Sequence, residues 1–207
     1  MNILVSEQLR PKTFDDLVLS VKLRDRLKRM YETGNVMNML FFGKPGSGKT
    51  TAAKIFVDSD EFTAITINGS LETSIDSVRT KIQNFASSCS LFNTPKICFI
   101  DEADYLSKNA QAALRGVIEQ TSSNCRYIFT ANSLDKIHHA LCSRLLPISF
   151  DLTASQIDEA LETYTNRVIE KLRETVPDAD ADRVRQIISL NYPDYRTIAN
   201  SLEFEFM

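Results

Sequence analysis

The chain has 207 residues, of which 43% are hydrophobic and 25% are charged, and its formal net charge is −3. This length suits one compact domain plus a small second one, and the negative net charge excludes a global basic field, so any nucleic-acid contact must be a local patch. No apolar run has the length of a signal peptide or a membrane span, and the four cysteines form no C-x-x-C pair, so we expect a cytoplasmic protein with reduced thiols, no membrane partner and no zinc site.

Short apolar runs alternate with longer amphipathic runs over the first 150 residues. The apolar runs have the length of buried strands and lie at 37–42, 62–67, 96–101, 126–131 and 145–150. The runs between them have helical periodicity and lie near 49–57, 74–87, 107–120 and 134–143. This alternation predicts an α/β fold with a parallel sheet, here of five strands, and helices on both faces of the sheet.

The strand pattern ends after Phe150, and only helical patterns follow. Thr153 is a candidate N-cap for the first of them. The three patterns lie near 154–174, 179–190 and 194–204. We therefore predict a nucleotide-binding α/β domain over residues 1–150 and a small all-helical lid domain over residues 151–207.

A glycine-rich motif follows the first predicted strand. Residues 43–51 have the sequence GKPGSGKTT, which matches the phosphate-loop pattern G-x-x-x-x-G-K-S/T between a strand and a helix. Backbone N–H groups of such a loop close around phosphate oxygens, and the helix adds its N-terminal dipole. Lys49 supplies a charge near the β- and γ-phosphates, and Thr50 supplies a hydroxyl for Mg²⁺. The predicted nucleotide-binding residues of the loop are Lys44, Pro45, Gly46, Ser47, Gly48, Lys49, Thr50 and Thr51.

Acidic residues follow the third predicted strand, in the run KICFIDEAD. Because a parallel strand delivers its carboxyl end to the ligand crevice, Asp101 is a candidate Mg²⁺ ligand, and Glu102 is a candidate base for the water that attacks the γ-phosphate. A pair of solvated acids at a strand end is the alternative. We expect Asp104 to cap a turn or to face solvent, without a catalytic role. The letters D-E-A-D also occur in helicases, but the length leaves no room for a second motor domain.

With these motifs in place, the sequence resembles the AAA+ ATPases and, within them, the sliding-clamp loaders of DNA replication. The matching stretches follow family order and lie at 9–18, 41–51, 67–70, 75–87, 99–119, 127–144 and 192–203. The resemblance is closest to the large, ATP-hydrolysing subunit of T4-like phage clamp loaders. It implies an AAA+ core that uses ATP or ADP with Mg²⁺ and drives the opening and loading of the polymerase clamp.

The implied partners are the other clamp-loader subunits in a ring or spiral, the sliding clamp and primer–template DNA. A phage-encoded chain would act in the bacterial host cytoplasm. The family's subunits carry a third, helical collar domain, which is absent from these 207 residues, and both a fragment and a naturally short form stay open.

The resemblance also implies roles for single residues. Asn132 corresponds to the sensor-1 residue near the γ-phosphate, and Arg196 corresponds to the sensor-2 arginine that reaches the phosphates from the lid. Arg144 corresponds to the arginine finger, which acts on the ATP of a neighbouring subunit. The alternatives are an asparagine in a turn and two surface arginines. The implied adenine pocket consists of Glu7, Gln8, Leu9, Arg10, Pro11, Leu17 and Val18, with Leu9 where the family usually has tyrosine.

In this family, helix N-termini that line the inside of a spiral contact the DNA phosphates. The corresponding residues here are Thr73, Ser74, Arg79, Ser107 and Lys108. Gln111 corresponds to the glutamine that couples DNA binding to the catalytic glutamate, and Arg115 is expected to face a neighbouring subunit. Two other functions stay open: another AAA+ replication ATPase of the helicase-loader type, and a structural subunit that binds nucleotide without hydrolysing it.

Overall fold

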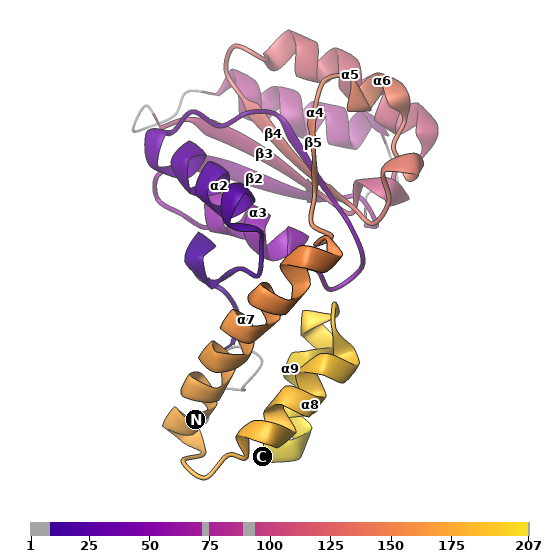
Figure 1. The fold of residues 1–207 in the computed structure, drawn as a ribbon. Helices are drawn as coiled ribbons and strands as arrows, with labels where there is room; N and C mark the ends of the chain where they lie inside the picture. Colours follow the sequence, from indigo (N-terminus) through magenta and orange to yellow (C-terminus); the bar gives the residue numbers. More distant parts are fainter. Residues whose placement is uncertain (1–8, 72–74, 89–93, 207) are drawn as a thin grey trace.

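The structure is a computed structural model and describes residues 9–71, 75–88 and 94–206 (Figure 1). Among these residues, five strands form one parallel sheet in the order β2-β3-β4-β1-β5. The strands are β1 Met39–Phe42, β2 Thr63–Asn68, β3 Lys96–Asp101, β4 Arg126–Ala131 and β5 Leu146–Ser149. Phe42 pairs with Ala131, and Asn68 pairs with Asp101, so the carboxyl ends of neighbouring strands lie level along one edge of the sheet.

Helices cover both faces of the sheet, because alternate strand residues point to opposite sides. Met39 and Phe41 pack in one apolar cluster with α2 (Val21–Thr33) and α3 (Lys49–Val57). Leu40 packs in a second cluster with α4 (Ile75–Ser87) and α5 (Lys108–Thr121) on the other face. Figure 1 shows the same two layers. The predicted parallel five-stranded sheet with helices on both faces is confirmed.

Two parts of the core differ from the sequence prediction. The pattern analysis did not predict α2, which ends at Gly34 in the left-handed conformation with a φ of 66°. The single helix predicted over 134–143 is wrong. The chain forms the 3-10 turn η3 (Leu134–Lys136) and the short helix α6 (His139–Cys142), because Ile137 between them is extended. Two further 3-10 turns are η1 (Phe14–Asp16) and η2 (Ala103–Tyr105).

Three helices follow the sheet, and we refer to them as the lid helices. They are α7 (Ala154–Thr175), α8 (Ala181–Asn191) and α9 (Tyr195–Phe206). Thr153 forms a capping box with Gln156 at the start of α7, as the sequence predicted for the cap. The lid helices enclose their own apolar cluster, which Leu9 and Val18 join from the start of the chain. None of the helices in the described ranges has the length and apolarity needed to cross a membrane.

Candidate nucleotide-binding site

The glycine-rich loop connects β1 to α3 at the carboxyl edge of the sheet. Gly43, Gly46 and Gly48 have φ values of 148°, 75° and 90°, which L side chains rarely adopt. A Cβ on Gly46 would also lie 2.1 Å from Oδ1 of Asp194 at the start of α9. The N–H of Tyr195 donates to the carbonyl oxygen of Gly46 at 3.2 Å. Glycine is therefore needed at position 46 both for the turn and for the close approach of a lid helix.

Polar groups of the loop fit a phosphate. The Lys49 Nζ turns back and donates to the carbonyl oxygens of Gly43 at 2.9 Å and Lys44 at 2.8 Å. Burial lowers the pKa of the Lys49 ammonium, and the carboxylate of Asp151 counteracts part of this shift. The Ser47 Oγ is buried and finds no hydrogen-bond partner among the described residues. A buried cation and an unsatisfied hydroxyl beside a helix N-terminus match the needs of a phosphate group.

Thr50 and Asp101, the two candidate Mg²⁺ ligands, lie in direct contact. The Thr50 hydroxyl donates to Asp101 Oδ1 at 2.9 Å. Thr130 donates to the same oxygen at 2.5 Å and accepts the N–H of Glu102 at 2.9 Å. Hydroxyl and carboxylate oxygens are the protein ligands that suit Mg²⁺. Sequence reasoning missed Thr130, although a threonine between Phe129 and Ala131, near the carboxyl end of a predicted strand, was a usable signal.

Glu102 has a left-handed backbone, with φ 55° and ψ 44°. A non-glycine residue in this region costs on the order of 1–3 kcal/mol, and such residues cluster at functional sites. Gly69 after β2 makes room for this turn, because a Cβ there would lie 2.6 Å from the carbonyl oxygen of Glu102. The N–H of Gly69 donates to the carbonyl oxygen of Asp101 at 2.8 Å. The backbone at the end of β2 therefore supports the turn that carries both acidic residues.

Asn132 lies at the end of β4 and is held by Asp104. The backbone N–H and the Nδ2 of Asn132 donate to Asp104 Oδ2 at 3.4 Å and 3.3 Å. The Asp104 side chain is only 1% exposed, so of the two expected positions, a turn cap or a solvent-facing side chain, the second is wrong. The turn η2 directs this carboxylate inward, beneath the end of β4, whereas the sequence alone indicated only a polar residue after the D-E pair.

A cavity of about 660 Å³ lies between the phosphate loop, the segment 9–19 and the lid helices. This volume lies within the range of small-molecule sites. The predicted residues that line it are Leu9, Arg10, Pro11, Leu17, Val18, Gly46, Ser47, Gly48, Lys49, Thr50, Thr51 and Arg196. Lys44 and Pro45 are not among the lining residues, and Glu7 and Gln8 lie outside the described residues.

Three tyrosines that the sequence analysis did not single out also line the cavity. Tyr164 of α7 and Tyr195 of α9 form an edge-to-face pair with centroids 5.1 Å apart, and Tyr31 of α2 lines the core side. Burial raises the pKa of Tyr164 to about 12, so its hydroxyl stays protonated at neutral pH. No sequence spacing could reveal this set, because the three tyrosines come from three separate helices.

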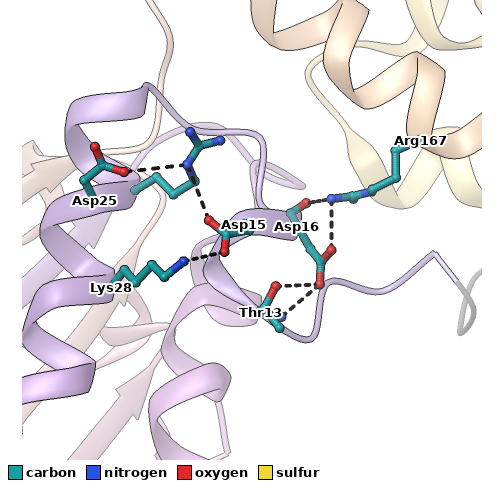
Figure 2. Close-up of polar contacts among 7 residues, drawn as sticks. Thr13, Asp15, Asp16, Asp25, Lys28 and Arg167 are labelled. Carbon is teal, nitrogen blue, oxygen red and sulfur yellow. Dashed lines mark hydrogen bonds and ion pairs between the residues drawn. The ribbon is translucent and has the colours of Figure 1, made fainter.

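The segment before β1 joins the core to the lid helices (Figure 2). Arg167 of α7 donates to the backbone oxygen of Asp16 and lies 3.4 Å from its Oδ1. The N–H and the hydroxyl of Thr13 donate to Asp16 Oδ2, both at 2.9 Å. On the other side, Asp15 accepts from Lys28 of α2 at 2.6 Å. Polar contacts therefore fix η1 to a core helix and to a lid helix at once.

Arg144 does not line this cavity. Its Nε and Nη2 lie 2.7 Å and 2.5 Å from Glu119 Oε1, and the Nε of Arg115 lies 3.2 Å from the same oxygen. The Arg144 side chain is 36% exposed. In the single chain this arginine is therefore paired at the surface, and both arginines that the resemblance assigns to a subunit interface meet at one carboxylate.

Of the residues predicted to contact DNA, three are described: Arg79 lies in α4, and Ser107 and Lys108 lie at the start of α5. Arg79 is exposed on α4, whereas Ser107 caps α5 by accepting the N–H of Ala110 at 3.2 Å. The Lys108 Nζ donates to the carbonyl oxygen of Lys136 at 2.7 Å. The other two predicted residues, Thr73 and Ser74, lie outside the described residues.

Gln111 of α5 is fully buried behind the acidic turn. Its Nε2 donates to the carbonyl oxygens of Ala103 at 3.2 Å and Leu106 at 3.0 Å, at the two ends of η2. Its Oε1 accepts the N–H of His138 at 2.6 Å. A single amide thus connects α5, η2 and the segment before α6.

Comparison with known proteins adds three observations. Residues 39–153 match the family described as ATPase family associated with various cellular activities (AAA). The chain is 34% identical to the replication factor C small subunit of Saccharolobus solfataricus, over 97% of this chain and 61% of that protein. It is 33% identical to the replication factor C small subunit of Archaeoglobus fulgidus, over 95% of this chain and 62% of that protein.

Among solved structures, the RuvB Holliday junction branch migration motor of Thermotoga maritima has the same fold, with a TM-score of 0.70 and 18% sequence identity. The match covers 95% of this chain and 64% of that chain. The chain thus spans about three fifths of the length of the curated relatives it matches.

Proposed function

The chain belongs to the AAA family of ATPases, and from this premise we propose that it is an ATP-hydrolysing motor subunit of a sliding-clamp loader. The observation that carries this proposal is the arrangement at the carboxyl edge of the sheet. There the phosphate loop, the contact between Thr50 and Asp101, and the strained turn at Glu102 lie side by side. Similarity to two replication factor C small subunits supports the choice of clamp loading within the family.

The residues divide the work as follows. The loop amides and Lys49 would bind the β- and γ-phosphates, and Thr50 and Asp101 would hold Mg²⁺. When bound, ATP would supply the phosphoanhydride bond, and Mg²⁺ would supply the positive charge that stabilises the leaving phosphate oxygens. Glu102 orients and deprotonates the attacking water. Asn132 and Arg196 act as the two sensor residues of the nucleotide. The position of Arg196, which lines the cavity from α9, supports its sensor role.

We also propose that the adenine base lies among the residues that close the cavity on the lid side. Leu17 and Val18 offer apolar contacts, and the rings of Tyr164 and Tyr195 offer an aromatic surface from the lid helices. Leu9 is buried in the lid cluster. The lid tyrosines would then replace the aromatic side chain that the family usually has at position 9.

Arg144 is proposed to act on the nucleotide of a neighbouring subunit. Two observations support this role: the arginine does not line its own chain's cavity, and it lies partly exposed at the surface. A guanidinium supplied by a partner stabilises the charge that builds on the γ-phosphoryl oxygens in the transition state. We expect the isolated chain to be a slow ATPase for this reason.

The proposal extends to the partners of the assembled protein. These are other loader subunits, the sliding clamp and primer–template DNA, which the starts of α4 and α5 would contact. Buried Gln111 would transmit this contact to the acidic turn. From the sequence motifs we also propose a kinship with T4-like phage clamp loaders, action in the cytoplasm of a bacterial host, and a division of the chain into two domains at residue 150.

A turnover assay tests the proposal. ATP hydrolysis by the chain is measured alone, with primer–template DNA, and with DNA plus a sliding clamp and the remaining loader subunits. A clamp-loader motor shows the highest rate in the complete mixture. Stimulation by DNA that needs no clamp would favour a helicase loader instead. Full nucleotide binding without turnover in any mixture would favour the structural subunit.

A further inference from the structure

We infer that Asp104 is a positioning residue that fixes the orientation of the Asn132 side-chain amide toward the nucleotide phosphates. The inference rests on the proposed ATPase function and assigns a task to a carboxylate that the known motifs of the chain leave without one. Asp104 follows the acidic pair by two residues, and Asn132 lies at the end of the adjacent strand β4.

The contact between the two residues has a defined polarity. An ionised carboxylate only accepts hydrogen bonds, and Asp104 Oδ2 receives both the backbone N–H and the Nδ2 of Asn132. The two ends of a carboxamide have the same shape, so packing alone does not choose between them. The Asp104 charge makes that choice, because a flipped amide would place its oxygen against the carboxylate.

This choice matters for the chemistry that Asn132 would perform. Phosphate oxygens accept hydrogen bonds, and the Asn132 Nδ2 carries a second N–H beyond the one given to Asp104. The Asn132 Oδ1 points to the opposite side of the amide and can accept a hydrogen bond from water. With the amide fixed in this sense, one side chain offers a donor to phosphate and an acceptor to water.

Burial of Asp104 supports a functional task rather than a contribution to stability. Its side chain is 1% exposed, and its Oδ1 is buried without a hydrogen-bond partner among the described residues. The Lys136 ammonium is 3.9 Å from the other oxygen, beyond hydrogen-bonding distance. A buried carboxylate with an unsatisfied oxygen carries a desolvation penalty, which a neutral residue would avoid.

The turn that carries Asp104 also connects it to Glu102. The N–H of Tyr105 donates to the carbonyl oxygen of Glu102 at 3.0 Å and closes the turn around Asp104. Gln111 holds both ends of this turn through its side-chain amide. A shift of this turn therefore moves Glu102 and Asp104 together, so the proposed base and the residue that orients Asn132 keep their relative positions.

The test compares four variants of the full chain: Asp104→Ala, Asn132→Ala, the double variant and Lys136→Ala. The matched control Lys136→Ala removes the distant cation and keeps the backbone carbonyl that Gln111 and Lys108 use. The first readout is the NMR signal of the Asn132 side-chain amide without nucleotide. We expect this signal to shift and broaden in Asp104→Ala and to stay in place in Lys136→Ala.

The second readout is single-turnover ATP hydrolysis, together with ADP affinity from calorimetry. Asp104→Ala should slow hydrolysis about tenfold, the scale seen when partners that orient catalytic ligands are removed, with ADP affinity unchanged. The double variant should be no slower than Asn132→Ala, because Asp104 acts through Asn132. If Asp104→Ala does not fold, Asp104→Asn takes its place, since it keeps the volume and one acceptor oxygen but not the charge, and a smaller loss is expected.

An equal loss from the Asp104 substitution in the parent and in the Asn132→Ala background would overturn the inference, and so would an unmoved Asn132 amide signal. A parent chain that hydrolyses no ATP in any mixture would refute the proposed function instead. The NMR comparison would still decide whether Asp104 orients Asn132, so the two failures are distinguishable.

Discussion

Lys49 is the residue on which nucleotide affinity depends most directly. Its ammonium is buried and donates to two loop carbonyl oxygens, so we expect it to exchange these acceptors for phosphate oxygens when a nucleotide binds. Hydrogen bonds to charged groups contribute about 1.5–3 kcal/mol, so we expect Lys49→Ala to weaken ADP binding by about 10- to 150-fold. Calorimetry measures this loss. Lys22→Ala is the control, because Lys22 is exposed on α2 and does not line the cavity, and the ADP affinity of this variant should stay within about twofold of the parent.

Glu102 should separate binding from chemistry. Glu102→Gln keeps the side-chain volume and its bond to water, but glutamine is a far weaker base. We expect unchanged ATP affinity and a loss of about 10²-fold or more in single-turnover hydrolysis. A variant that hydrolyses ATP at the parent rate inside a complete loader would show that another group is the base.

Single residues also mark how far the sequence predicts this site. The phosphate loop, Asp101 and Glu102 were predictable from the sequence, because the loop has a fixed motif spacing and the two acids directly follow one apolar strand. Asp104 was not, since its inward orientation depends on the left-handed turn at Glu102, which no local pattern encodes. Tyr164 and Tyr195 were missed for a different reason: their contact exists only after the lid helices pack together.

At the scale of elements, the contact between α9 and the phosphate loop depends on Gly46. A methyl group there would meet Asp194 at 2.1 Å, and the backbone has a φ of 75°. We expect Gly46→Ala to destabilise the protein by more than about 1 kcal/mol and to weaken nucleotide binding. Thermal unfolding and ADP titration measure the two effects.

Gly116→Ala is the matched control for that substitution. Gly116 lies inside α5, and a Cβ there would meet no described atom outside its own helix backbone within 4 Å. Alanine in a helix interior is favoured over glycine by about 0.5–1 kcal/mol, so this variant should be more stable than the parent. If Gly46→Ala and Gly116→Ala changed thermal stability in the same direction, the proposed dependence of the contact between α9 and the phosphate loop on Gly46 would be contradicted.

The turn η1 should make stability depend on pH. Burial raises the pKa of Asp16, but the hydrogen bonds from Thr13 and Lys12 and the nearby charge of Arg167 together outweigh it, and the pKa lies below the usual value of 3.8. A carboxyl with a depressed folded-state pKa stabilises the fold above its unfolded pKa, and that stabilisation is lost as pH falls through the folded pKa.

Asp16→Asn should therefore lower the melting temperature at neutral pH, by a difference that shrinks below about pH 4. Thermal unfolding over a pH series checks this. Asp25→Asn is the control, because Asp25 is an exposed partner of Arg24 at 4.0 Å and should change little at any pH. A pH-independent effect of Asp16→Asn would mean that the loss reflects packing and not charge.

Elements also differ in how well their sequence predicts them. The strands and the helices after them have clear apolar periods, so their limits agree with the pattern to within one or two residues. The helix predicted over 134–143 failed, because the His138 side chain caps α6 by accepting the N–H of Ala140 and fixes an extended residue in the middle. Local polar contacts of this kind compete with a helix that periodicity alone would favour.

At the scale of the whole molecule, the proposed arginine finger Arg144 lies outside the cavity that Lys49 and Arg196 line. Arg144 is paired with Glu119 at the surface, so in an assembly it can extend to a neighbour. We expect Arg144→Ala to leave nucleotide binding by the single chain unchanged. In an assembled loader, the same variant should lose about 10³–10⁵ in hydrolysis rate, the range known for arginine fingers. Arg115→Ala is the comparison variant, because Arg115 shares the Glu119 contact and is assigned no part in hydrolysis.

Mixing two inactive variants tests whether Arg144 acts between subunits. Each Arg144→Ala subunit keeps an intact Glu102, and each Glu102→Gln subunit keeps an intact Arg144. If the arginine acts in trans, some interfaces of a mixed assembly combine both intact groups, and part of the hydrolysis returns. If it acts within its own chain, no site in the mixture is complete, and activity stays lost. Native mass spectrometry confirms that mixed assemblies form, so a failure to recover activity in them would count against the trans role.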